Sequence, residues 1–535
     1  MTRTEYGESL AIGDFSPRNN ADGQARVPDP PGSTKGTSKL VIALSIFAAL
    51  RILVFAVAFP LSNNVDERFH FMTIQMYAEG GSPGKELPRM DPAKARIFSL
   101  YWSPEYRHSP EELDRDGASR PLYGLPAQIR DSALAQGFYA TQLKRWLLRP
   151  NFEAQSPPLY YVAAAAWYNL GAALGMRDWG LDYWPRFLNP IAYALLVWLS
   201  YRFVLRVYPE RTFLLLAVPA IIAVFPQDVF FGMNRDVFSP PLAAAALLLM
   251  MQAVDSKPNR YGSLLLGSFL VGLAFLSSVS NCVLYGALAA TLWVWVHRST
   301  GTLDHKIWVV SASALAAGVL PSLWMLRNYL VMGDLTAGRA KAHDLGWTVK
   351  PLADMIHHPL FSFHGLRYFL LELTRSFWHG EYVWHGLPMR SAWADRFYIL
   401  SSAIFVVLFA LDFVARRRAI SPLQRLAGFQ AVFLVASSVL FLAVISLPFD
   451  FHDCAYPSRL YPYFVSGRII SGALLPFVLI YASGLELVTN RLRKWVPPVA
   501  VLACLMLFIT VSEIRVRSVV FSSPYNFFAL SRWQR

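Results

Sequence analysis

Long uninterrupted apolar stretches restrict the fold of this sequence more than any other feature. A run of about 20 apolar residues lets a helix cross the hydrocarbon core of a bilayer, where backbone polar groups must bond to one another. About twelve such stretches lie at 40–61, 157–175, 187–206, 212–227, 237–254, 261–280, 282–297, 307–328, 397–415, 426–447, 469–489 and 496–513. The sequence therefore predicts an all-α polytopic membrane protein with about 12 transmembrane helices, within a range of 11 to 13.

The residues before the first apolar stretch have a different character. Residues 1–39 are polar, with scattered glycine and proline, which is typical of disordered chain. The stretch 40–61 is too long for the apolar region of a cleaved signal peptide. We therefore expect a disordered cytoplasmic tail over 1–39 and a single transmembrane unit over 40–535.

Three long polar segments separate the apolar stretches, at 62–156, 328–396 and 448–468. Basic clusters occur at other turns, namely Lys257/Arg260, His297/Arg298/Lys306, Arg416/Arg417/Arg418 and Arg491/Arg493/Lys494. Cytoplasmic loops of membrane proteins carry an excess of Lys and Arg, so the three polar segments are predicted to lie outside. The first should form amphipathic helices at the membrane surface, for example over 66–79.

In one region, the predicted spans conflict with the expected cytoplasmic location of basic residues. Two full spans between 157 and 206 would leave Arg202, Arg206 and Arg211 outside, against the usual distribution of basic residues. Either one segment in this region is re-entrant or split, or a further span is not recognised in the sequence.

Charge and cysteine content exclude some classes of partner. The net charge of +14 suits contact with anionic headgroups. Basic and aromatic residues are not interleaved as in a nucleic-acid groove, so we expect no nucleic-acid partner. The three cysteines form no CxxC motif, which argues against a disulfide framework or a thiolate zinc site. A divalent metal bound by carboxylates stays possible.

Two adjacent acids follow the first apolar stretch closely. Asp66 and Glu67 could be the solvated start of a helix capped by Asn64. Alternatively, a carboxylate near the membrane surface could act as a general base or bind a metal. His70 lies one helical turn further on, where it could orient either acid.

Other polar residues interrupt or end apolar stretches. Asn234 and Asp236 lie in a short turn between two of them, as a cavity lining or as a hairpin tip. Arg327, Arg459 and Arg468 lie near predicted outer span ends. Such arginines either extend towards the headgroups or bind phosphate with a bidentate guanidinium. A further group, His379, Glu381 and His385, fits no standard metal spacing, and we expect no structural metal there.

Several short motifs occur in a familiar order. They are Asp66-Glu67 after the first span, the large outer segment, Ser156-Pro157-Pro158-Leu159-Tyr160-Tyr161, Asn234-Arg235-Asp236, Trp324-Met325-Leu326-Arg327-Asn328, Phe377-Trp378, and Gly467-Arg468 with Pro476. Together they resemble the GT-C superfamily of membrane glycosyltransferases, which includes the protein O-mannosyltransferases and the aminoarabinose transferase of lipid A. The likeness covers most of 40–490 and is greatest to a bacterial branch of uncharacterised predicted membrane proteins.

The sequence departs from that branch at two places. Arg68 follows the acids where small residues or proline are common, and Ser277-Ser278 lies where lysine is frequent. Contacts to the donor are therefore expected to differ from those of the branch.

The resemblance implies an inverting transfer of sugar from a polyprenyl-phosphate donor to a glycan, lipid or protein acceptor, in the bacterial inner membrane with the active site outside the cytoplasm. It implies catalytic roles for Asp66 and Glu67, with Asp66 as base and Glu67 or His70 orienting it. Asp236, supported by Asn234, would bind acceptor or metal, and Arg327, Arg468 and Arg459 would bind the donor phosphate. The alternatives are a transporter or flippase, although no repeated interrupted helices are visible, and an oligosaccharide polymerase or ligase.

Overall fold

The computed structural model describes residues 34–62, 65–255, 261–454 and 456–533. The first helix, α1, begins at Thr34, so residues 34–39 belong to it and not to the predicted tail. The rest of that predicted tail lies outside the described residues, as do Asn64 and the cluster Lys257/Arg260.

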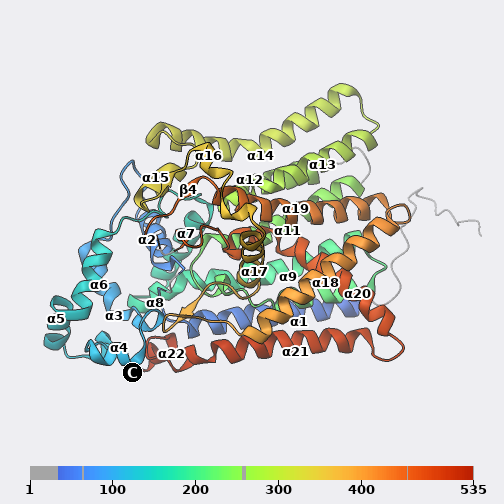
Figure 1. Cartoon of the computed structure of the whole chain (residues 1–535). Coiled ribbons are helices and arrows are strands. Elements are labelled where there is room, and N and C mark those ends of the chain that lie inside the picture. Colours follow the sequence, from blue (N-terminus) through green and yellow to red (C-terminus); the bar gives the residue numbers. More distant parts are fainter. Residues whose placement is uncertain (1–33, 63–64, 256–260, 455, 534–535) are drawn as a thin grey trace, which may run out of the picture.

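Long helices run between two ends of the molecule (Figure 1). They are α1 (Thr34–Ala58), α9 (Leu188–Val207), α11 (Ser239–Asp255), α13 (Val283–Arg298), α14 (Leu303–Met332), α18 (Ala392–Arg416), α19 (Pro422–Ser446), α20 (Leu474–Leu492) and α21 (Pro498–Arg517). Among the described residues, nine helical segments are long and apolar enough to cross a membrane, and two shorter apolar helices accompany them, α10 (Thr212–Ala223) and α12 (Gly262–Ser277). The chain is thus an all-α, multi-pass membrane protein, but the predicted count of twelve is not confirmed.

The stretch 157–175 forms the short helix α7 (Leu159–Ala173), which folds back on the segment before α9. The rings of Trp167 and Trp184 stack at 5.1 Å, and each indole N–H donates to the other residue's carbonyl, at 3.1 and 2.7 Å. The intervening turn contains α8 (Asp178–Tyr183) and η3 (Trp184–Phe187). α7 and α8 therefore form a hairpin at one end, and only α9 runs the length of the bundle.

This hairpin bears on the topological conflict described for residues 157–211. Arg206 pairs with Asp255 at the end of α11, at 2.6 Å, and Arg211 pairs with Glu486 near the end of α20. The basic residues after α9 thus lie with those two helix ends. The turns from α18 to α19 and from α20 to α21 lie at this same end, opposite α2–α8 (Figure 1).

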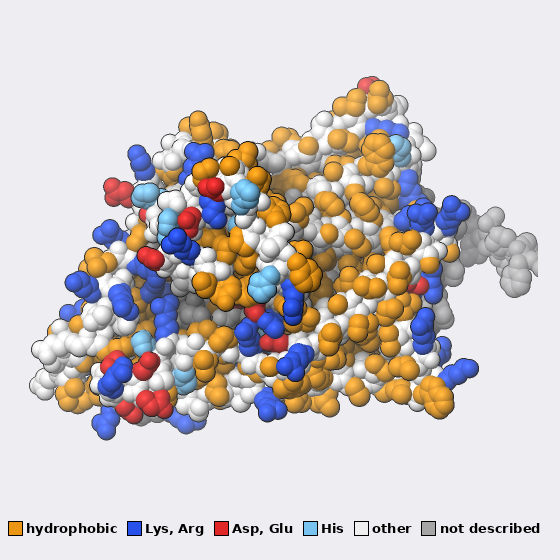
Figure 2. Space-filling model, in the orientation of Figure 1, with side chains coloured by type: hydrophobic (Ala, Val, Ile, Leu, Met, Phe, Trp, Pro, Cys, Tyr) orange, Lys and Arg blue, Asp and Glu red, His pale blue; other side chains and the backbone are white. Residues whose placement is uncertain are grey.

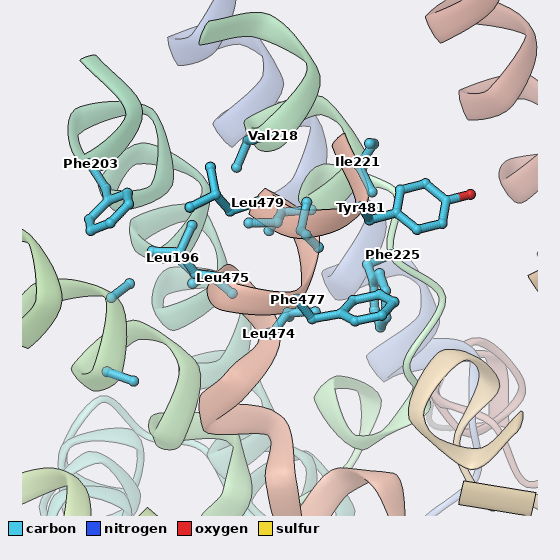
Figure 3. Packing of buried hydrophobic residues seen from close by; sticks show 14 of the residues in the cluster. Leu196, Phe203, Val218, Ile221, Phe225, Leu474, Leu475, Phe477, Leu479 and Tyr481 are labelled. Atoms are coloured by element: carbon cyan, nitrogen blue, oxygen red, sulfur yellow. The ribbon is translucent and has the colours of Figure 1, made fainter. Parts of the chain in front are cut away.

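The core of the bundle is the packing of α9, α10 and α20 (Figure 3). Leu196 of α9, Ile221 of α10 and Leu479 of α20 are all buried. Gly484 of α20 meets the backbone of Phe405 in α18, and a Cβ there would overlap its carbonyl. In a membrane, the hydrophobic effect does not drive helices together, because the surrounding lipid is itself apolar. Close packing of helix backbones at small residues stabilises their association instead.

The opposite end of the molecule is built from short elements. Between α1 and α7 lie α2 (Glu67–Ala78), α3 (Pro92–Tyr101), η1 (Pro104–Tyr106), α4 (Pro110–Arg115), η2 (Leu122–Gly124), α5 (Ala127–Ala135) and α6 (Gly137–Leu148). The predicted helix at 66–79 is confirmed as α2. Charged side chains gather at both ends of the molecule, and apolar ones cover the middle (Figure 2).

The later polar segments add to this same end. They contain α15 (Gly338–Asp344), β1 (Thr348–Val349), α16 (Leu352–Met355), η7 (Pro359–Phe361), α17 (Phe363–His379), β2 (Val383–Trp384), β3 (Leu387–Pro388), β4 (Phe449–Asp450) and η8 (Gly467–Ala473). β1 pairs antiparallel with β4, which joins the segments 328–396 and 448–468, and β2 pairs with β3.

The C-terminal residues close this end. After η9 (Ser518–Ser522) the chain ends its described part in α22 (Phe527–Trp533). The hydroxyl of Tyr123 donates to the Pro524 carbonyl, and that of Tyr183 donates to the Tyr525 carbonyl at 3.3 Å. The last residues therefore pack against the first polar segment.

Candidate active site

Glu67 and Arg186 form a buried ion pair that fixes the start of α2. The Arg186 guanidinium donates to both carboxylate oxygens of Glu67, each at 2.6 Å. It also donates to the carbonyls of Ala56, Phe59 and Pro60 at 2.6–2.8 Å. Carbonyls at a helix C-terminus have no hydrogen-bond partner within the helix. Arg186 therefore supplies hydrogen-bond donors to the free carbonyls at the end of α1. Glu67 is fully enclosed, and its carboxylate ties α1, α2 and η3 together.

Asp66 lies immediately before α2 and its side chain takes a different direction. Its backbone is left-handed, with φ 60° and ψ 10°, a conformation that costs energy for a residue other than glycine. Although Asp66 is the N-cap residue of α2, its side chain makes no capping bond. The carboxylate instead faces Arg468, at 3.6 Å, and one third (33%) of the side chain is exposed.

Arg468 is the centre of a group of three carboxylates. Its guanidinium lies 3.0 Å from Asp236, 3.3 Å from Glu381 and 3.6 Å from Asp66. These acids come from segments far apart in the sequence and meet only in the fold. The single positive charge of Arg468 is thus shared, and its main effect is to hold the acids in place.

The turn between α10 and α11 positions Asp236, whose side chain is 1% exposed. The turn contains η4 (Asp228–Phe231) and η5 (Arg235–Phe238). The Asn234 side chain accepts a hydrogen bond from the Asp236 N–H at 2.9 Å, and the Ser471 hydroxyl donates to the Asp236 carbonyl at 3.1 Å. Asn234 therefore supports the site through the backbone.

Asp228 of the same turn holds the loop that carries Glu381. Its carboxylate accepts the N–H groups of Glu381 and Tyr382, at 2.9 and 2.8 Å. Gly380 has a φ of +92°, and a Cβ there would overlap the Asp228 carboxylate. Only glycine fits this approach. Burial raises the pKa of Asp228 to about 7.

A second charged group is centred on Glu153. Its carboxylate pairs with Lys341 of α15 at 2.6 Å and with Arg235 at 3.2 Å. The Ser156 and Tyr161 hydroxyls donate to it at 2.7 and 3.3 Å. Burial alone would raise the pKa of Glu153, but the two cations reverse this effect and hold it well below its usual range. Lys341 thereby fastens the segment after α14 over the site.

His70 adjoins this second group. Its Nδ1 lies 2.7 Å from the Tyr161 hydroxyl, and its Nε2 is buried with no hydrogen-bond partner among the described residues. Burial lowers the pKa of His70 to about 3, so the imidazole is neutral at physiological pH. Its side chain is bound to Tyr161, and its predicted role of orienting Asp66 stays a prediction.

The surroundings of Asp66 alter its pKa. Displacement of water by the surrounding protein raises the pKa of Asp66, Arg468 opposes this effect, and Glu153 adds to it. An accessible carboxylate with a raised pKa is suited to accept a proton during a reaction. Asp66 is thus a partly exposed acid with a raised pKa, beside Arg468.

Two predicted phosphate ligands lie elsewhere. Arg327 donates to the Asn328 side chain at 3.0 Å near the end of α14, and Arg459 is exposed in the loop before η8. In the part of the chain that the structure describes, neither lies within 4.0 Å of a carboxylate oxygen, and only Arg468 of the three joins the acidic group. No group of three or more His, Cys, Asp or Glu among the described residues is arranged to hold a metal.

Sequence reasoning did not identify several members of the site. Glu381 was considered only as a metal ligand beside two histidines. Glu153 precedes the Ser156-Pro157-Pro158 motif by three residues, and that proximity was the one available signal. Asp228 lies in the same turn between two apolar stretches as Asp236, whereas Lys341 carries no sequence signal, since its partner lies far away along the chain.

Comparison with known proteins adds no family. No protein-family model matches the chain, and no curated protein matches its sequence. The functional interpretation therefore depends on the geometry of the site and on the motifs of the sequence.

Proposed function

We propose that this protein transfers a sugar from a polyprenyl-phosphate donor to a glycan, lipid or protein acceptor outside the cytoplasm, with inversion of the anomeric carbon. The observation that carries the proposal is Asp66, which is partly exposed, has a raised pKa and lies just past the end of α1. A helix that crosses the bilayer ends near the headgroups, where a lipid phosphate also lies. The position of Asp66 just past the end of α1 thus supports a lipid-phosphate donor.

The proposed reaction is a single displacement. The acceptor hydroxyl oxygen attacks the anomeric carbon while the bond from that carbon to the phosphate oxygen breaks. Asp66 takes the hydroxyl proton, and the phosphate leaves with the bonding electron pair. Asp236 and Glu381 hold Arg468, which in turn holds Asp66 in its left-handed conformation. A base placed in this way contributes about 10²–10⁴ to the rate.

We further propose that the loop-rich end lies outside the cytoplasm in a bacterial plasma membrane. Counting α10 and α12 as crossings together with the nine long apolar segments would give eleven. With the start of α1 inside, this count leaves the basic turns on the cytoplasmic side, as the positive-inside rule requires. In this count, residues 157–207 contribute one crossing, by α9, and α7 and α8 do not cross.

Cysteine labelling tests this orientation. In a background without the three native cysteines, cysteines at Lys144, His343 and Arg459 should react with an impermeant thiol reagent in intact cells. Cysteines at Arg417 and Arg493 should react only after permeabilisation. All five positions are exposed, so differences in labelling report the side of the membrane. The reverse pattern would place the site in the cytoplasm and remove the proposal.

The direct test of function is sugar transfer by the purified protein. Radiolabelled polyprenyl-phosphate sugars are supplied in nanodiscs with envelope extracts as acceptor, beside matched polyprenyl-diphosphate oligosaccharides. Transfer from the monophosphate donor is expected. Mass spectrometry of envelope glycans from cells with and without the gene identifies the sugar. Substrate uptake into proteoliposomes without any transfer would instead establish a transporter. Transfer from diphosphate-linked oligosaccharides alone would establish a polymerase or ligase.

A further inference from the structure

Three arginines beside Asp66 form no ion pair with an acid in the described part of the chain. Arg68 follows Asp66 by two residues on α2, Arg107 follows η1, and Arg149 is the C-cap residue of α6. Within the described ranges, no carboxylate oxygen lies within 4.0 Å of any of them, in contrast to Arg186 and Arg468. Their charge is therefore available to a ligand.

Two of these arginines share an aromatic support. The guanidinium carbon of Arg68 lies 4.5 Å from the centre of the Phe69 ring, and that of Arg149 lies 5.8 Å from the same ring. The Asn151 side chain donates to the Phe69 carbonyl at 3.2 Å and to the Thr73 hydroxyl at 3.0 Å. The segment after α6 is thus bound to α2, which places Arg149 and Arg68 on one preformed wall.

The charge of the third arginine, Arg107, acts on the same group of side chains. The charges of Arg107 and Arg149 act on each other, and both act on Arg68 and on Asp66. Partial displacement of water by nearby protein and these like charges lower the pKa of Arg68 to about 9, and displaced water and Arg149 lower the pKa of Arg107. Repulsion among the three is relieved only in part by Asp66, which is the condition under which an added anion binds favourably.

We infer that Arg68, Arg107 and Arg149 bind the phosphate group of the lipid donor beside Asp66. This inference rests on the proposed function. Arg107 and Arg149 are exposed and Arg68 is half-buried, so an incoming phosphate can reach all three. Guanidinium groups bind phosphate oxygens in pairs, and these bonds strengthen as the leaving phosphate gains charge.

This assignment separates two kinds of arginine in the site. Arg468 has its charge shared among three carboxylates and acts on their geometry. The arginines of the outer wall are uncompensated and act on the ligand. The predicted phosphate ligands Arg327 and Arg459 belong to neither kind.

Binding of decaprenyl phosphate to the purified full chain in nanodiscs tests the inference. Arg68→Gln and the double variant Arg107→Gln/Arg149→Gln should each weaken binding about tenfold or more, since each loses a charge-assisted hydrogen bond. Arg68→Lys keeps the charge but loses the fork and should fall between wild type and Arg68→Gln. Arg115→Gln is the matched control, because Arg115 is exposed on the same segment and pairs only with Asp116 among the described residues. It should bind as wild type does.

Two further probes, inorganic phosphate and phosphatidylglycerol, distinguish the sources of phosphate. Arginine-dependent binding of decaprenyl phosphate and inorganic phosphate, with weak binding of phosphatidylglycerol, supports a donor site. Equal, arginine-dependent binding of phosphatidylglycerol would show a general headgroup contact and overturn the inference. So would wild-type affinity for decaprenyl phosphate in all arginine variants, or no binding of either phosphate by wild type. If sugar transfer persists in these cases, the proposed function remains supported and only the arginine site is rejected. If decaprenyl phosphate binds in an arginine-dependent way but no sugar is transferred, the phosphate site is supported and the proposed function is rejected.

Discussion

Replacing Asp66 with asparagine should reduce sugar turnover by about 10²–10⁴-fold, because the acceptor hydroxyl loses its proton acceptor. Asparagine preserves the shape of the side chain, and the left-handed conformation at this position is one that asparagine adopts readily. Yield in the membrane and binding of decaprenyl phosphate should therefore stay near those of wild type. The measurement is transfer from a radiolabelled polyprenyl-phosphate sugar, beside donor binding by the same preparation.

The pH profile supplies an independent readout of this base. The raised pKa of Asp66 means that its ionised, active form is lost as the pH falls through a value above the ordinary 3.8. The acidic limb of kcat/KM should lie there in wild type and be absent from the residual activity of Asp66→Asn. Asp131→Asn, an exposed acid on the same segment, is the control and should change neither rate nor profile. Full turnover in Asp66→Asn would remove this residue from the mechanism.

Glu67→Gln should have its largest effect on stability. The substitution leaves the buried Arg186 charge without its partner, which typically lowers the free energy of unfolding by about 3–5 kcal/mol. Thermal unfolding in detergent, followed by fluorescence, measures this change against wild type. Asp131→Asn removes an exposed pair with Arg96 at 3.6 Å and should cost about 0–1 kcal/mol.

The adjacent acids thus make opposite predictions. Asp66→Asn should lose turnover and keep its unfolding midpoint, while Glu67→Gln should lose stability first. A Glu67→Gln protein with a wild-type midpoint and no turnover would move the catalytic role to Glu67. Arg186→Met serves as the partner test, since it unpairs Glu67 and also frees the carbonyls of Ala56, Phe59 and Pro60.

The positions of the helices could be predicted from the sequence because apolar runs and helices coincide here. All the predicted apolar stretches are helical, and α2 lies where an amphipathic helix was expected. Hydropathy does not report whether a helix crosses the membrane. α7 is helical over most of its predicted stretch, yet the mutual hydrogen bonds of Trp167 and Trp184 turn it back. Such a pair forms only in the fold and leaves no periodic signal.

The candidate site could be predicted only where a motif marks it. Asp66, Asp236 and Arg468 stood out as charges at the edges of apolar runs, and the structure brings these three together. Glu67 stood out for the same reason, but its environment is that of a structural ion pair. Glu381 and Lys341 lie in long polar segments where acids and lysines are common, and their significance comes from partners at residues 468 and 153. Pairing over such separations is set by helix packing, which one sequence does not reveal.

The contact between the C-terminal residues and the first polar segment has a consequence for biogenesis. Tyr123 bonds to Pro524, 401 residues later in the chain. The outer layer around the site thus combines segments that are translated far apart in time. If the loop-rich end lies outside, the first outer segment must wait until α21 and the residues after it have left the ribosome before it can adopt its final packing. A chain truncated before α21 would then insert most of its helices and still lack a complete outer surface. Proteases and chaperones that recognise incomplete proteins would therefore act on its outer segments, while the helical bundle is already formed.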